Sequence, residues 1–312
     1  MMRNGLRAAA LFAAYGTIGF GGDYAAELLA QEPDVDDLEV RVVTEAEPIV
    51  DVVVDVRPEV FIDVQVRHSS ECSYTEAREM TIRADGLSRL GIDAGSGELR
   101  VEGRHGVSDV VVTAVACASV EEWLDELTVT VDETADGIQL IAHYPERRGW
   151  RGRDNTARLD LTVLVPLGFA VDIDDSSGGI EVTGTGDLRI ADSSGSISAR
   201  GVNGSVSIDD SSGEVDIADV SGDVDVEDGS GGIRVVDVQG SVLLRDGSGG
   251  IEVSDVDQDV IVESDGSGSI DARRILGDFA VGRDGSGSIR YEDVGGLVDV
   301  PEDKRRRRRG GR

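Results

Sequence analysis

The C-terminal half of the sequence repeats itself with a period close to 18 residues. The four-residue word D-[GS]-S-G recurs at spacings of 17 to 19 residues, and its aspartates are Asp175, Asp192, Asp210, Asp228, Asp246, Asp265 and Asp284. A short period sustained over many repeats is typical of a solenoid, in which each repeat buries its apolar face only against its neighbours. The repeat therefore excludes an ordinary globular core for this part of the chain.

Each repeat divides into two halves of nine residues. The segments GIRVVDVQG (232–240) and SVLLRDGSG (241–249) both fit the pattern x-Φ-x-Φ-x-D-x-x-G, where Φ is aliphatic. Alternating aliphatic residues predict a short strand with one buried face, and the closing Asp and Gly predict a turn. One repeat is then two strands and two turns. The sequence therefore predicts an all-β fold, a parallel β-helix (β-solenoid) with about 18 residues per coil.

Aliphatic residues at equivalent positions of successive coils are the expected core. β-branched side chains suit such columns because they pack well on a pleated surface. The valine of the D-V-x-G turns, such as Val238, is expected to fill a corner of the coil. One predicted column contains Ile180, Ile197, Val215, Ile233, Ile251, Ile270 and Ile289, and a second contains Val224, Val242, Val260 and Phe279.

The N-terminal half is less regular. RLGIDAGSGELRVEGRHG (89–106) predicts one early coil. Residues 107–170 are predicted to form a small α+β insertion that covers the first strand edges of the solenoid, since such edges must be capped. Within it, residues 119–127 predict a short helix with a capping box from Ser119 to Glu122.

The chain is predicted to contain one structured domain with extensions at both ends. The N-terminal run AAALFAAYGTIGF (8–20) follows a basic start and is too short to span a bilayer, which predicts a cleaved signal peptide and no transmembrane span in the mature chain. A buried or amphipathic segment is the alternative. The predicted parts are a signal peptide (1–30), an acidic, partly extended segment (31–70), a solenoid domain (71–303, with regular coils over 171–303) and a basic tail (304–312).

Two further features bear on these predictions. VDVVVDVRPEVFIDVQV (50–66) predicts a pair of strands around Pro58. The chain has 2 cysteines, Cys72 and Cys117, and an oxidising compartment would let them form a disulfide; two free buried thiols are the alternative. A signal peptide and a disulfide together predict export to the periplasm, cell envelope or extracellular space.

The charge of the chain limits its partners. The formal net charge is −32, which excludes nucleic acid as a favoured partner. The basic tail is either a solvated end or a segment that binds anionic envelope polysaccharide, anionic lipid headgroups or the acidic edge of another copy. The candidate anion-binding residues of the tail are Lys304, Arg305, Arg306, Arg307, Arg308 and Arg309.

The repeated aspartates are the main candidate site. Catalysis is disfavoured because it needs one special pair of carboxyl groups, not seven equivalent ones. The favoured role is to cap backbone amides in solvated turns, and weak calcium binding along the column is the alternative. No catalytic residue and no cofactor are expected. The calcium candidates are Asp192, Asp210, Asp228, Asp246, Asp265 and Asp284.

Three longer passages resemble a known family. They are RLGIDAGSGELRVEG, ARLDLTVLVPLGFAVDIDDSSGGIEV and DFAVGRDGSGSIRYEDVGGLVDVP. The pattern resembles a bacterial "putative adhesin" family of unknown function whose members carry serial D-G-S-G-x-[IV] repeats, and the resemblance covers about residues 70–301. It implies an exported or envelope-associated β-solenoid without known catalytic residues.

The function expected from these observations is non-enzymatic. The chain is predicted to be an exported, envelope-associated adhesin or structural scaffold that acts through repeated contacts along its edge. Two other classes remain open, a carbohydrate-active β-helix enzyme and a calcium-binding repeat module.

Overall fold

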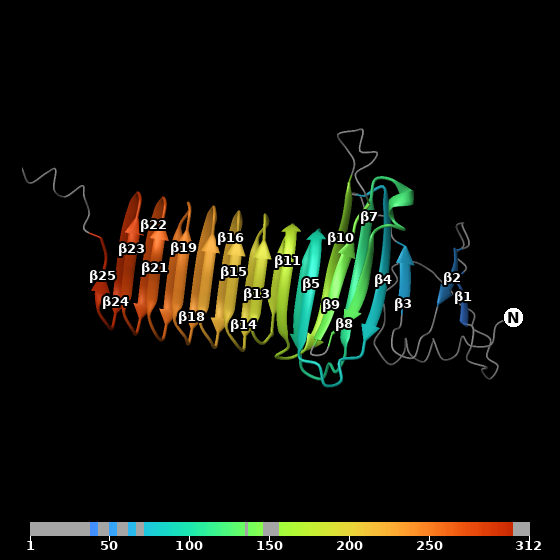
Figure 1. Ribbon diagram of the computed structural model, residues 1–312, viewed down its shortest axis with the longest axis horizontal. Coiled ribbons are helices and arrows are strands. Elements are labelled where there is room, and N and C mark those ends of the chain that lie inside the picture. The colour runs from blue at the N-terminus through green and yellow to red at the C-terminus, as the bar shows by residue number, and fades with distance from the viewer. Residues whose placement is uncertain are drawn as a thin grey trace, which may run out of the picture.

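The protein is a rod made of two facing β-sheets (Figure 1). Its structure is a computed structural model, which describes the backbone of residues 38–42, 50–54 and 62–66 and, in full, residues 72–134, 137–145 and 156–301. The chain winds back and forth between the two sheets in about 7 turns of roughly 18 residues each. The predicted all-β solenoid is therefore confirmed.

Sheet I has 12 strands and sheet II has 11, and both run the length of the rod. In spatial order, sheet I contains β24 (Gly287–Val294), β22 (Gly268–Ile275), β20 (Ile251–Val256), β18 (Gly231–Val238), β16 (Gly213–Val220), β14 (Ile197–Val202), β12 (Ile180–Thr183), β6 (Leu99–Arg104), β10 (Ala157–Pro166), β7 (Val110–Ala118), β4 (Tyr74–Ile82) and β3 (Ile62–Val66). Sheet II contains β25 (Val298–Asp299), β23 (Phe279–Asp284), β21 (Val260–Asp265), β19 (Val242–Asp246), β17 (Val224–Asp228), β15 (Val206–Asp210), β13 (Leu188–Asp192), β11 (Ala170–Ser177), β5 (Arg89–Ser96), β9 (Gly137–His143) and β8 (Thr128–Glu133).

The core lies between the sheets and consists of the predicted aliphatic columns. Strands of successive coils pair in parallel with like residues opposite, so that Ile233 lies beside both Val215 and Ile251. The column residues are almost fully buried, except that Ile289 in the last coil is half-buried. Val238 is buried at its corner, as predicted.

The backbone conformation differs between the two corners of each coil. At the D-[GS]-S-G corner, Gly231 has φ 152°, and a Cβ atom there would overlap the carbonyl oxygen of Gly213 in the preceding coil. At the D-V-x-G corner the left-handed residue is the aspartate, as at Asp237 with φ 60°, not the glycine expected from the sequence. Asp tolerates this conformation better than most residues, because its short side chain bonds locally.

The N-terminal end of the rod is covered by antiparallel strands. β5 and β6 form the predicted early coil, since they pair in parallel with β11 and β12. Beyond them β10 continues sheet I in parallel with β6, and β7, β4 and β3 follow antiparallel. In sheet II, β9 and the antiparallel β8 extend the edge of β5.

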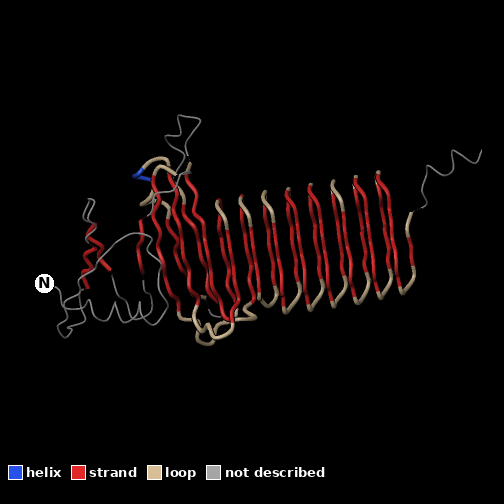
Figure 2. The backbone as a smooth tube through the Cα atoms, turned by 180° about the vertical axis from the view of Figure 1, so that it is seen from behind, coloured by secondary structure: helices blue, strands red, loops and turns tan. Residues whose placement is uncertain are grey.

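Two local predictions for this end hold only in part. Residues 50–66 form two strands around Pro58, as predicted, but these do not pair with each other: β2 (Val50–Val54) pairs with β1 (Leu38–Val42), and β3 pairs with the free edge of β4. The predicted helix over 119–127 is a single 3-10 turn, η1 (Glu121–Trp123), seen near one corner of the rod in Figure 2.

The reason for the short helix lies in the contacts of its ends. The hydroxyl of Ser119 accepts a hydrogen bond from the Thr156 N–H at 3.1 Å, so it does not form the predicted capping box. The guanidinium of Arg78 donates to the carbonyls of Leu124 (3.0 Å) and Leu127 (2.8 Å). These contacts hold the segment as a loop against β4.

The predicted disulfide is confirmed. Cys72 and Cys117 are bonded, with their Cα atoms 5.6 Å apart, and the bond ties the segment before β4 to the end of β7. Among the described residues no helix is long and apolar enough to cross a membrane. The signal peptide predicted over 1–30 and the basic tail over 304–312 lie outside the described residues.

Candidate functional site

The repeated aspartates form a column inside the rod, at one corner of every coil. Each lies directly opposite its counterparts in the neighbouring coils, from Asp175 through Asp192 and onward to Asp284. The members from Asp175 to Asp265 are only 2–5% exposed. The prediction of solvated turns is therefore wrong. The pattern Φ-x-Φ-x-D indicates this burial, because residues two apart on a strand face the same side, so the aspartate shares the buried face of the aliphatic residues.

One oxygen of most of these carboxylates caps a backbone amide, as predicted. The Ser248 N–H donates to Oδ1 of Asp246 at 2.9 Å, and the Ser230 N–H donates to Oδ1 of Asp228 at 3.0 Å. Asp192 and Asp210 make the same contact two residues downstream. Oδ2 of these four aspartates is buried and has no hydrogen-bond partner within the described part of the chain.

Burial and mutual repulsion make these groups harder to ionise. Burial, followed by the charge of Asp192, raises the pKa of Asp175 to about 7. Burial also raises the pKa of Asp210 and that of Asp246 to about 6, and neighbouring carboxylates add to both shifts. For Asp192, Asp228 and Asp265 burial raises the pKa as well. These buried carboxyl groups therefore bind protons at a higher pH than an ordinary aspartate does.

The column ends at Asp175, under a tyrosine. The residue opposite Asp175 in the early coil is Gly95, and the ring of Tyr144 lies where a side chain at Gly95 would stand. The Tyr144 hydroxyl accepts from the Ser96 N–H at 2.8 Å and donates to the carbonyl of Ala94. Burial raises the pKa of Tyr144, which keeps the phenol neutral. The sequence did not predict this role for Tyr144, because the residue directly follows β9 and does not belong to the repeat.

The calcium hypothesis concerns this column. Within the residues described in full, no three His, Cys, Asp or Glu side chains are grouped so that they could hold a metal ion. The candidate ligands are brought into one row, but they face the interior and not a solvated edge. Calcium binding stays the untested alternative for this column, and its test is given below.

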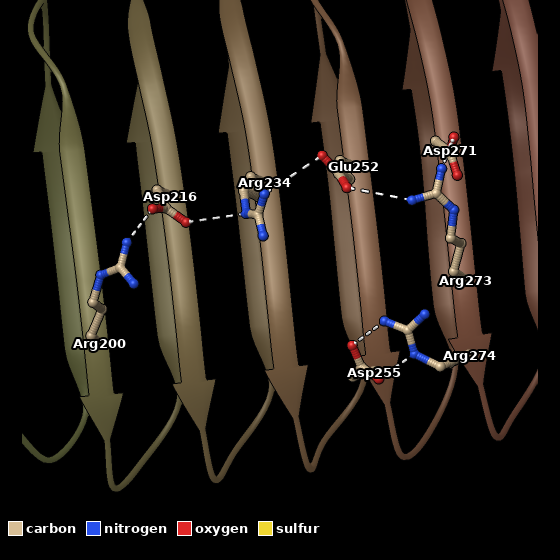
Figure 3. A network of polar contacts seen from close by, with 8 residues as sticks. All are labelled: Arg200, Asp216, Arg234, Glu252, Asp255, Asp271, Arg273 and Arg274. Atoms are coloured by element: carbon tan, nitrogen blue, oxygen red, sulfur yellow. Dashed lines mark hydrogen bonds and ion pairs between the residues drawn. The ribbon is translucent and has the colours of Figure 1, made fainter.

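A second feature is a strip of alternating charges on the outer face of sheet I (Figure 3). Arg234 lies 3.8 Å from Asp216 on one side and 3.8 Å from Glu252 on the other, and Arg273 then joins Glu252 to Asp271. We call this the charged strip; its members are Arg200, Asp216, Arg234, Glu252, Asp271 and Arg273. Near its end, Arg274 makes two 2.6 Å hydrogen bonds to Asp255.

The charged strip leads into an open groove near the first coils. The groove has a volume of about 450 Å³ and is lined by residues of β6, β10, β12 and β14. Arg100 and Glu181 face it as an ion pair at 2.6 Å, with Arg200 at one side. Asp160 also faces it and accepts a hydrogen bond from the Glu98 N–H at 2.9 Å. Sequence reasoning missed this groove, since β10 and β6 are far apart in the chain.

Comparisons with known proteins give structural neighbours only. No family model matches the chain, and no curated protein matches it. Similar solved structures include a "putative cell adhesion protein" from Clostridium sporogenes (11% identity, 78% of this chain and 99% of that chain, TM-score 0.28) and a "putative adhesin" from Bacteroides fragilis (10% identity, 72% and 97%, TM-score 0.36).

Another similar structure is a "putative lipid binding protein" from Parabacteroides distasonis, with 17% identity over 73% of this chain and 97% of that chain, and a TM-score of 0.32. Proteins described as adhesins are thus among the structural neighbours. At these identities and TM-scores the neighbours assign no ligand and no activity to this chain.

Proposed function

We propose that this chain is an exported, envelope-associated adhesin or scaffold that binds a repetitive anionic or hydroxyl-rich polymer without catalysis. The observation that supports this proposal best is the charged strip, which offers guanidinium and carboxylate groups on coil after coil of a rigid sheet. A single exposed ion pair contributes little to binding. A polymer that contacts many coils at once gains affinity through the high effective concentration of each further contact.

The groove supports the same proposal. It widens the contact surface at one end of the charged strip, and its Arg100–Glu181 pair can exchange hydrogen bonds with sugar hydroxyls. The proposed partner is an envelope polysaccharide, and the basic tail adds affinity where the polymer or a lipid headgroup is anionic. The Cys72–Cys117 disulfide suits an oxidising periplasmic or extracellular location. The proposal needs no cofactor.

Binding of the full chain to purified envelope polysaccharides tests this proposal. We expect the double variant Arg200→Gln/Arg234→Gln to weaken binding about tenfold, because two guanidinium contacts are lost along the strip. The matched control is Arg189→Gln/Arg245→Gln, which removes two ion-paired arginines from sheet II. Removal of residues 304–312 should weaken only the binding of anionic polymers. Negligible binding by every form would overturn the proposal.

A second candidate function is polysaccharide cleavage in the groove, which the carboxylates of Glu98, Asp160 and Glu181 favour. Two of these groups already have structural partners, since Glu181 pairs with Arg100 and Asp160 caps Glu98 and lies 3.2 Å from Arg158. The release of reducing ends from a bound polysaccharide, abolished by Glu98→Gln, would favour the enzyme over the adhesin.

A further inference from the structure

The last coil leaves both sheets with an open edge. β24 is the terminal strand of sheet I and β25 is that of sheet II, and no other described strand pairs with their outer sides (Figure 1). Apolar side chains are exposed there, with Tyr291 at 49% and Leu297 at 77%. The opposite end of the rod differs, because antiparallel strands cover its first coils.

The open edge of β24 presents unpaired backbone groups. In the preceding coils, the glycine that closes the D-[GS]-S-G word donates its N–H to the next coil, as Gly249 does to the Ser267 carbonyl (2.8 Å) and Gly268 to the Ser286 carbonyl (2.9 Å). Gly287 is the equivalent residue of β24. Since strand residues alternate in direction, Gly287, Ile289 and Tyr291 direct their N–H and C=O groups to the open side. Such an edge is a template for another strand.

We propose that two copies of this chain join end to end through β24, related by a two-fold axis. The axis is normal to the sheets, so that each β24 strand pairs antiparallel with its counterpart in the other copy. Sheet I then continues into sheet I, sheet II continues into sheet II, and the two cores merge. The half-buried Ile289 and Val294 and the exposed Tyr291 become interior. The inference does not depend on which ligand the charged strip binds.

The charges of β24 select the register of this pairing. If Tyr291 lies on the axis, Arg290 of each copy faces Glu292 of the other, and both side chains are on the exposed outer face. Opposite charges across an antiparallel pair stabilise it, and like charges destabilise it. A shift of the axis to Arg290 would place the two guanidinium groups against each other. A self-complementary strand of this kind favours a second copy over an unrelated partner.

Charge exchange tests the proposal directly. We expect the full chain to be a dimer at micromolar concentrations by sedimentation or light scattering. Arg290→Glu should weaken the dimer about tenfold or more, because both facing pairs become repulsive, and Arg290→Glu/Glu292→Arg should restore it. Arg189→Glu makes the same charge change on an exposed residue of β13, far from β24, and should have no effect. A chain that stays monomeric, or a dimer insensitive to Arg290→Glu, would overturn the proposal.

Cross-linking tests the geometry independently of charge. In the proposed register the two Tyr291 Cα atoms are about 5.5 Å apart, which is within the range of a disulfide. Tyr291→Cys should therefore cross-link on oxidation. Leu276→Cys, at a more exposed turn of the preceding coil (67%), should not. If removal of residues 304–312 abolished the dimer while Arg290→Glu left it intact, the tail and not the strand edge would hold the copies together, and the proposal would be wrong.

Discussion

At the scale of single residues, the buried aspartate column combines a useful contact with an unfavourable charge. Oδ1 of Asp246 caps the Ser248 amide, whereas its Oδ2 is buried without a partner in the described structure. Burial, with the charge of Asp228, raises the pKa of Asp246 to about 6. The folded state therefore binds more protons than the unfolded state between about pH 4 and pH 6, and ionisation of this group lowers stability as pH rises through that window.

The substitution Asp246→Asn should show how much the buried charge of Asp246 lowers the stability of the fold. The amide keeps the oxygen that caps Ser248 and removes the charge, so we expect a higher thermal midpoint than wild type at pH 7.5. At pH 4, where Asp246 is protonated in the folded protein, the difference should largely vanish. Thermal unfolding at the two pH values measures this. The control is Asp237→Asn at the exposed corner with φ 60°, which Asn also tolerates. Equal effects of the two substitutions at pH 7.5 would refute the buried-charge explanation.

At the scale of elements, the corner between the sheets depends on glycine for close approach. A Cβ atom at Gly231 would overlap the carbonyl oxygen of Gly213, whereas at the next residue, Gly232, the nearest atom is 3.8 Å away. We therefore expect Gly231→Ala to lower the free energy of unfolding by about 3 kcal/mol, the upper end of the range for a residue held in a strained backbone conformation. Gly232→Ala should change it by less than about 1 kcal/mol. Denaturant unfolding of the two variants checks this, and similar losses would show that the stacked carbonyl is not the cause.

The elements also show what could be predicted from the sequence. The coils, core columns and amide-capping aspartates follow from a local pattern that repeats, so that each copy supports the same interpretation. The alternation of the strand places Asp246 on the buried face together with the aliphatic residues, although aspartate is usually exposed. Other features depend on contacts between distant segments that do not repeat, and a local sequence pattern does not predict such contacts. They are the pairing of β3 with β4, the groove between β10 and β6, and the position of Tyr144 over Gly95.

At the scale of the whole molecule, the excess of negative charge should weaken the folded rod at low ionic strength. The chain carries 62 acidic and 30 basic residues, and parallel stacking brings many acids of neighbouring coils close together. Screening shortens the range of this repulsion from about 30 Å in 0.01 M salt to about 10 Å in 0.1 M salt. A rise in the thermal midpoint with added NaCl is therefore expected from charge alone, and any test for calcium must separate the two effects.

A comparison of the thermal midpoints in calcium and in magnesium at equal ionic strength separates specific calcium binding from charge screening. Screening and weak association with surface acids affect the midpoint similarly for the two ions, whereas a column of carboxylates that held calcium would favour the larger and less strictly octahedral cation. Because the aspartates of the column are almost fully buried and Oδ1 of Asp228 and of Asp246 already caps a backbone amide, we expect equal midpoints in millimolar CaCl₂ and MgCl₂. A greater rise in calcium that Asp246→Asn removes and Asp237→Asn retains would instead place the ion within the aspartate column, and the repeat would then be a calcium-binding module.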